Sequence, residues 1–123
     1  MRLLLDTHAA IWWLAGDARL SEPARAAIAT AGAQSVVSVA SIWEASIKRS
    51  AGRLRGPDLT AAAGAAGLPL LRIDERHAKL AGELPLVHRD PFDRMLVAQA
   101  SVEGLAIVSA DERIPKYGVP VIW

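Results

Sequence analysis

Residues 88–100 read His-Arg-Asp-Pro-Phe-Asp-Arg-Met-Leu-Val-Ala-Gln-Ala, and the rest of the chain is organised around this stretch. Asp90 followed by Pro91 predicts the start of a helix, because Asp is a good N-cap and Pro suits the first helical position. The residues that follow are apolar and helix-compatible, and Gly104 is a natural residue to end the helix. Residues 105–108 then predict a buried strand. Helix and strand together form one unit of an α/β fold.

The same alternation of strand and helix extends over the whole chain, which is typical of a mostly parallel sheet covered by helices on both faces. The predicted strands are residues 2–5, 35–39, 70–73, 105–108 and 119–122; the first is expected at the centre of the sheet and the last, which contains Pro120, at an edge. The predicted helices are residues 8–15; 21–31, stopped by Gly32; one capped by Ser38 or Ser41 and ended by Gly52; one capped by Asp58 or Thr60 and ended near Gly67; 75–80, closed by Gly82; and 91–103.

The overall composition limits the class of protein. A chain of 123 residues fits one domain, here residues 1–123, and can bury roughly two-thirds of its unfolded surface. The net charge is +1, so any basic patch must be local. No cysteine is present, which excludes disulfides and thiolate metal sites. No apolar run is long enough for a signal peptide or a membrane span, and we expect a cytoplasmic protein.

Four acidic residues are predicted to meet at one edge of the sheet. Asp6 follows the first strand, Asp111 follows the fourth, Asp93 lies in the first turn of its helix, and Glu44 lies about one turn into another. The C-terminal ends of parallel strands share an edge, and sites form there. Packed carboxylates repel one another unless a cation joins them, and oxygen ligands favour Mg²⁺ or Mn²⁺. Such a cluster supports phosphoryl or phosphodiester displacement with metal-activated water.

Each acid also has a purely structural interpretation. Asp6 fits a helix N-cap, and Asp111 fits a loop acid. Glu44 fits a capping box with Ser41, or an ion pair with Lys48 four residues later. Asp93 could form a reciprocal cap with the residue three positions before it. It is the shared location of the four acids that favours a site.

The remaining polar and aromatic residues give weaker signals. The densest basic segment could bind a nucleic-acid backbone, although a solvated helix end with dipole-stabilising cations is an equal alternative; it comprises Lys48, Arg49, Arg53 and Arg55. Trp12, Trp13 and Trp43 are interpreted as core or dimer-interface residues rather than stacking platforms. The three histidines have no metal-ligand spacing and are interpreted as structural or surface residues; they are His8, His77 and His88.

Five motifs occur in order along nearly the whole chain: residues 3–8 (Leu-Leu-Leu-Asp-Thr-His), 41–44 (Ser-Ile-Trp-Glu) with Lys48, 52–54 (Gly-Arg-Leu), 88–94 (His-Arg-Asp-Pro-Phe-Asp-Arg), and 109–111 (Ser-Ala-Asp) before 120–123 (Pro-Val-Ile-Trp). In these motifs the sequence resembles the PIN-domain ribonucleases, and among them the VapC toxins of type II toxin–antitoxin systems. The Asp-Pro-Phe-Asp start of the helix is the most specific part.

The resemblance implies a three-layer α/β/α sandwich and an RNA-cutting endoribonuclease that is silenced by a cognate VapB antitoxin and commonly forms homodimers. It implies a metal site of Asp6, Glu44, Asp93 and Asp111 with Mg²⁺ or Mn²⁺, and supporting hydroxyls from Thr7 and Ser109. Many relatives carry Thr where Ser109 stands, and Ser keeps the hydroxyl. Asp90 is interpreted as a helix cap outside the metal site.

Three other functions are compatible with parts of the pattern. An aspartate-nucleophile phosphatase usually has a second Asp two residues after the first, where this chain has His8. A phospho-acceptor receiver module usually has two adjacent acids after its first strand, where this chain has only Asp6. A degenerate PIN domain that only binds a partner is disfavoured by the complete set of four acids.

Overall fold

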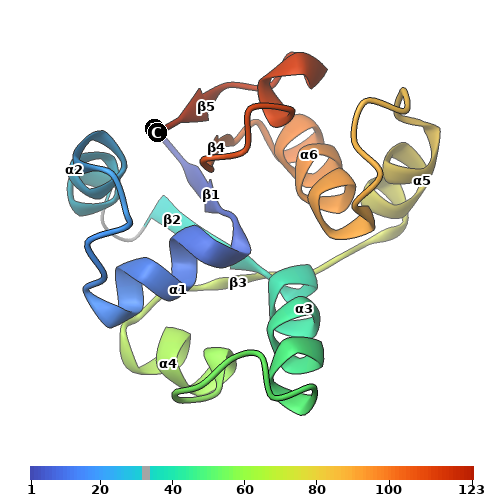
Figure 1. The fold of residues 1–123 in the computed structure, drawn as a ribbon. Coiled ribbons are helices and arrows are strands. Elements are labelled where there is room, and N and C mark those ends of the chain that lie inside the picture. The colour runs from blue at the N-terminus through green and yellow to red at the C-terminus, as the bar shows by residue number, and fades with distance from the viewer. Residues whose placement is uncertain (32–33) are drawn as a thin grey trace.

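The computed structural model describes residues 1–31 and 34–123 as a parallel sheet with helices on both faces (Figure 1). The five strands have the spatial order β3-β2-β1-β4-β5, and every neighbouring pair is parallel. This confirms the predicted fold class, the central first strand and the edge position of the last strand, which is shorter than predicted and begins after Pro120. The strands are β1 (Leu3–Leu5), β2 (Ser35–Ser38), β3 (Leu70–Leu71), β4 (Ala106–Val108) and β5 (Val121–Ile122).

The helices alternate with these strands along the chain. They are α1 (Thr7–Ala15), α2 (Glu22–Ala31), α3 (Val39–Ser50), α4 (Leu59–Ala65), α5 (Glu75–Glu83) and α6 (Pro91–Glu103), with a short 3₁₀ helix, η2 (Ile114–Tyr117), before β5. Within the described residues no helix is long and apolar enough to cross a membrane.

The central strand separates two apolar cores, because successive side chains of a strand point to opposite faces. Leu3 and Leu5 are buried in a core that also contains side chains of α1, α2 and α4. Leu4 is buried on the other face, with Leu96 and Val97 of α6. Figure 1 shows the same division, with α1, α2 and α4 on one side of the sheet and α5 and α6 on the other.

Helix α6 begins and ends as its sequence predicts. The side chain of Asp90 accepts a hydrogen bond from the N–H of Phe92 at 2.8 Å, and Pro91 occupies the first helical position. The helix ends at Gly104, whose φ of 69° lies in the left-handed region that favours glycine. The observed strand follows directly, so Asp93 and the end of β4 come to the same edge of the sheet.

Three details of the predicted caps need correction or completion. Ser38, and not Ser41, caps α3, because its hydroxyl accepts from the N–H of Ala40 while Ser41 lies buried inside the helix. Helix α5 continues past Gly82 to Glu83. The predicted stop at Gly32 lies outside the described residues.

Candidate metal centre

A cavity of about 270 Å³ opens at the C-terminal edge of the sheet, where β1 and β4 end. It contains all four acids that the sequence predicts to converge. Aromatic and basic side chains complete its walls. Its lining consists of Asp6, Thr7, His8, Trp12, Glu44, Lys48, Asp90, Asp93, Ala110, Asp111 and Arg113.

Asp6 serves both the helix and the cavity. It follows β1 directly, and its Oδ1 accepts a hydrogen bond from the N–H of Ala9 at 2.8 Å, so it caps α1. The side chain is nevertheless part of the cavity wall. Burial raises the pKa of this carboxyl, although hydrogen bonds from Ser109 and Ala9 and the charge of His8 oppose the rise. The cap and the site are therefore one feature rather than alternatives.

Glu44 is held at the cavity by contacts from two helices. The Thr7 hydroxyl lies 2.5 Å from Glu44 Oε1 and 2.9 Å from the hydroxyl of Ser41. Lys48 Nζ lies 3.1 Å from the other carboxylate oxygen, which confirms the predicted ion pair. The predicted capping box between Ser41 and Glu44 is wrong, because Ser41 lies within α3 and bonds the Thr7 hydroxyl instead.

Asp93 lies close to three other acids, and its pKa is raised. Burial, followed by the negative charge of Asp90, raises its pKa to about 7, and the charges of Asp6 and Glu44 act in the same direction. No reciprocal cap forms with Asp90, since the N–H of Asp90 donates to His88 Nδ1 instead. Crowding of like charges in a half-buried place is the electrostatic condition that a bound cation relieves.

Asp111 lies among hydrogen-bond donors. Its carboxylate accepts from the backbone N–H of Arg113 at 2.9 Å and from the Arg113 guanidinium at 3.1 and 3.0 Å. Hydrogen bonding by the Arg113 side chain holds the pKa of Asp111 well below its usual range, despite partial burial. The Ser109 hydroxyl accepts from the N–H of Asp111 at 3.1 Å and shapes this turn.

His88 is a site residue that the sequence interpretation missed. Its ring is buried, and its Nε2 lies 2.9 Å from Asp111 Oδ2 and 3.0 Å from Asp93 Oδ2. Because Nδ1 accepts from the N–H of Asp90 at 3.1 Å, the hydrogen-bond network assigns the proton of a neutral ring to Nε2. His88 is therefore a donor toward the carboxylates, and the only sequence signal for it is its place beside the Asp-Pro-Phe-Asp motif.

The loop that carries His88 is fixed by two further side chains. The Tyr117 hydroxyl accepts from the N–H of His88 at 2.8 Å. The Arg94 guanidinium donates to the carbonyls of Ala81, Leu84 and Pro85 at 2.9–3.0 Å, at the end of α5. These carbonyls would otherwise lack partners at a helix end. Arg94 thus joins α5 and the following loop to α6 beside the cavity.

The predicted basic segment is only partly at the site. Lys48 lines the cavity, while Arg49 lies 3.8 Å from Asp58, outside the lining. Arg53 and Arg55 are exposed in the loop after α3, and Arg55 lines a separate groove. A role of these residues in RNA binding stays a prediction.

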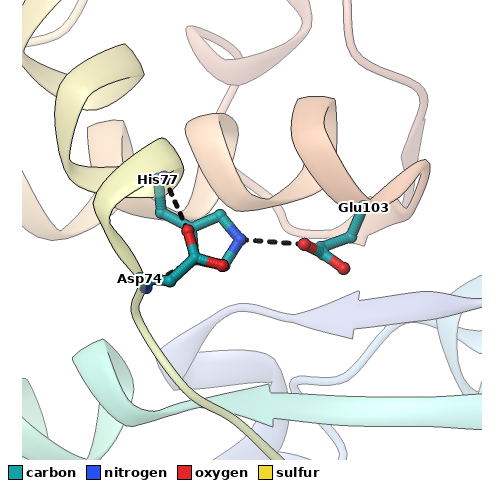
Figure 2. A group of neighbouring side chains, drawn as sticks. All are labelled: Asp74, His77 and Glu103. Atoms are coloured by element: carbon teal, nitrogen blue, oxygen red, sulfur yellow. Dashed lines mark hydrogen bonds and ion pairs between the residues drawn. The ribbon is translucent and has the colours of Figure 1, made fainter.

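A second cluster of potential ligands lies between α5 and α6, away from the cavity lining (Figure 2). His77 is buried; its Nδ1 accepts from the N–H of Asp74, which leaves Nε2 to donate to Glu103 at 3.0 Å. Arg76 donates to both acids, at 2.7 Å to Asp74 and 2.9 Å to Glu103. Because Arg76 and His77 already donate to both carboxylates, this group of Asp74, Arg76, His77 and Glu103, called here the His77 cluster, joins the start of α5 to the end of α6. It also agrees with the structural role predicted for His77.

The residues of the cavity fit a hard divalent cation. Carboxylate oxygens of Asp93 and Asp111 lie within 4.8 Å of each other and of a ring nitrogen of His88, which acts here as a donor and not as a ligand. Asp6 and Glu44 line the same cavity outside this tighter group. Carboxylate oxygens are the ligands that Mg²⁺ and Mn²⁺ favour. Acidic groups of this arrangement can hold a metal ion.

Comparison with known proteins agrees with this geometry. The model of the PIN domain family matches residues 3–120, and the chain belongs to that family. No curated protein sequence matches at a significant level. Among solved structures, the chain is similar to DNA-bound VapBC from Salmonella typhimurium, with 20% identity, coverage of 98% of this chain and 96% of that chain, and a TM-score of 0.71.

Two other solved structures share the fold at similar levels. A toxin–antitoxin complex from Klebsiella pneumoniae has 16% identity, covers 98% of this chain and 96% of that chain, and gives a TM-score of 0.68. FitAcB from Neisseria gonorrhoeae has 16% identity, coverage of 97% and 95%, and the same TM-score of 0.68. At these identities the likeness concerns the fold.

Proposed function

We propose that this chain is a metal-dependent endoribonuclease of the VapC type, the toxin of a VapBC pair. The observation that carries the proposal is the cavity at the sheet edge of a PIN domain, which is lined by Asp6, Glu44, Asp93 and Asp111. Membership of the PIN family also sets aside the phosphatase and the receiver module as alternatives.

These four carboxylates are the proposed ligands of Mg²⁺ or Mn²⁺. When bound, the cation would supply activation of water and stabilisation of charge at the scissile phosphate. The Thr7 hydroxyl donates to Glu44 and orients its carboxylate. The Ser109 hydroxyl accepts from the backbone N–H of Asp111 and so helps to place that residue. His88 donates to Asp111, and the same Nε2 lies 3.0 Å from Asp93, so the ring restrains both carboxylates.

The proposed inhibitor is a cognate VapB-type antitoxin. Support comes from the similar solved structures, which are a VapBC complex and a toxin–antitoxin complex. An apolar groove of about 250 Å³ between α1, α4 and the loop after α3 offers a surface for an apolar segment of that partner; Ile11, Leu14 and Leu59 line it. An Arg from the partner would pair with the cavity carboxylates and compete with the metal.

We also propose a homodimer. Trp43 and Ile47 expose 62% and 42% of their surface on one face of α3. Phe92 of α6 lies against Trp43 with ring centroids 5.0 Å apart, so the two helices present one apolar patch. A second copy of the chain is the proposed occupant. The expected setting is the cytoplasm, where RNA and Mg²⁺ meet.

The direct test is cleavage of RNA by the purified chain with Mg²⁺ or Mn²⁺, with and without EDTA. We expect cleavage that EDTA abolishes and that Asp6→Asn lacks, since Asn keeps the helix cap but removes the ligand charge. Cleavage by Asp6→Asn at the wild-type rate would refute the assigned site. Absence of cleavage on every RNA tested would favour a PIN domain that only binds a partner.

The toxin assignment is tested by expression in a bacterial host. We expect growth arrest by the wild type alone, and relief both by Asp6→Asn and by co-expression of the neighbouring small open reading frame. Equal arrest by wild type and Asp6→Asn would contradict a toxicity that depends on the metal site.

A further inference from the structure

Trp12 packs against the apolar core and also lines the acidic cavity. Helix α1 begins at the Asp6 cap, and His8 and Trp12 lie one turn apart on one face of it. Both side chains line the cavity together with the four carboxylates. Their ring centroids are 5.5 Å apart, with the planes tilted by 35°. An aromatic surface therefore borders the proposed metal centre.

The indole of Trp12 also contacts the core and two further side chains. It packs against the apolar core between α1, α2 and α4, and the ring of Trp123 lies 5.9 Å away at an angle of 53°. The guanidinium carbon of Arg19 lies 5.2 Å from the centroid of the Trp12 ring, in a cation–π contact. A ring fixed in this way loses little conformational entropy when a ligand stacks on it.

Two other tryptophans provide a comparison. Trp13, the next residue of α1, packs against the same core and does not belong to the cavity lining. Trp43 is exposed but meets Phe92 edge-on, at 77°, outside the lining. The aromatic wall of the cavity is thus a property of Trp12 and His8 and not of exposed tryptophans in general.

We propose that Trp12, bordered by His8, is the stacking platform for one unpaired base of a single-stranded RNA whose backbone enters the acidic cavity. The inference rests on the proposed nuclease function and adds the residues that contact a base. Acids repel an RNA backbone, and the two cations of the lining, Lys48 and Arg113, are already paired with Glu44 and Asp111. Stacking supplies affinity without charge and is open to unpaired bases of any kind.

The experiment measures binding in an Asp6→Asn background, in which cleavage is disabled and the α1 cap is kept. The probe is a short single-stranded RNA with 2-aminopurine placed at successive positions, titrated in the presence of Mg²⁺. We expect quenching at one position. We expect Trp12→Leu to weaken binding about tenfold or more, because base–aromatic stacking has that magnitude. Trp12→Phe keeps an aromatic face and should stay within about threefold.

Trp13→Leu is the matched control, because it removes an equal ring from the same helix and core without touching the cavity lining. A second series removes single bases from the RNA. At the quenched position, base removal should cost as much as Trp12→Leu and cost nothing further in the Trp12→Leu protein, as interacting groups require. A duplex RNA of the same sequence should bind more weakly.

Equal affinity of Trp12→Leu and Trp13→Leu for the single strand would overturn the platform, and so would equal costs of base removal at all positions. If Trp12→Leu fails to fold, the test uses the Asp6→Asn protein alone. Absence of 2-aminopurine quenching at every RNA position would then overturn the proposed role of Trp12. Cleavage of RNA by wild type with these negative results would refute the platform alone. Position-specific quenching without any cleavage would instead refute the nuclease function alone.

Discussion

His88 donates a hydrogen bond of 2.9 Å from Nε2 to the Oδ2 atom of Asp111. The partners come from two different elements, the loop before α6 and the turn after β4. The same Nε2 lies 3.0 Å from Asp93, so one buried ring connects two proposed metal ligands. The orientation of the His88 ring is also fixed by the N–H of Asp90, which donates a hydrogen bond to Nδ1. The imidazole would therefore act on the proposed metal centre through the carboxylates that it positions.

We therefore expect His88→Ala to lower Mn²⁺ affinity about 10–100-fold, the usual effect of removing a group that orients ligands. His88→Asn should recover part of this loss, because its amide keeps a donor. Affinity is measured by isothermal titration, beside Asp111→Asn, and the ring nitrogen shifts of wild type are followed by NMR. A Nε2 that stays protonated with Mg²⁺ supports positioning; wild-type affinity in His88→Ala would contradict it.

Asp93 makes the stability of the metal-free protein depend on pH. Burial and the Asp90 charge raise its pKa from the ordinary 3.8 to about 7 in the folded chain. The protonated form favours folding, so this contribution is complete below pH 3.8 and is lost as pH rises through 7, with a slope of at most about 1.4 kcal/mol per pH unit.

Asp93→Asn should consequently be more stable than wild type in EDTA at pH 8 and should lose this advantage at pH 4, in urea unfolding curves. Mg²⁺ at pH 8 should stabilise wild type but not Asp93→Asn, and Asp93→Asn should not cleave RNA. A constant stability difference between the two proteins from pH 4 to 8 would contradict the raised pKa.

Arg53 and Arg55 give a prediction that separates backbone binding from a solvated loop. Both side chains are exposed after α3, near the cavity-lining Lys48 in the sequence but outside the lining themselves. If they contact RNA phosphates, the double Ala variant should lower the slope of log affinity against log salt by about 1.4, since each single-strand contact contributes about 0.7. Arg2→Ala is the control, and an unchanged slope would return Arg53 and Arg55 to a solvated role.

The parts of the structure that follow from local sequence were predictable, and those that depend on contacts across the chain were not. Asp90-Pro91 and Gly104 define α6 by capping chemistry, which acts within a few residues. The convergence of the acids followed from the parallel direction of the strands, whose C-terminal ends share one edge of the sheet. The pairing of His88 with Asp111 joins residues 23 positions apart, and no periodicity encodes it. The hydrogen bond between the hydroxyls of Thr7 and Ser41, 34 positions apart, could not be predicted for the same reason.

Variants of the His77 cluster test whether contacts outside the cavity affect metal binding as well as stability (Figure 2). His77 is buried with both ring nitrogens bonded, to the N–H of Asp74 and to Glu103 at the end of α6. His77→Ala would leave Glu103 and the start of α5 without these partners and open a small cavity, so we expect a loss of about 2–4 kcal/mol in the free energy of unfolding. His8→Ala, on an exposed residue, is the control for stability.

The His77 cluster lies outside the cavity lining. Folded His77→Ala should therefore bind Mn²⁺ with wild-type affinity, although the midpoint of its urea unfolding should lie at a lower urea concentration. Hydrogen exchange should show faster opening of α5 and of the last turn of α6, with less change in α1. A loss of Mn²⁺ affinity comparable to that of Asp93→Asn would mean that Asp74, His77 and Glu103 themselves take part in metal binding. The purely structural role assigned to the His77 cluster would then be wrong.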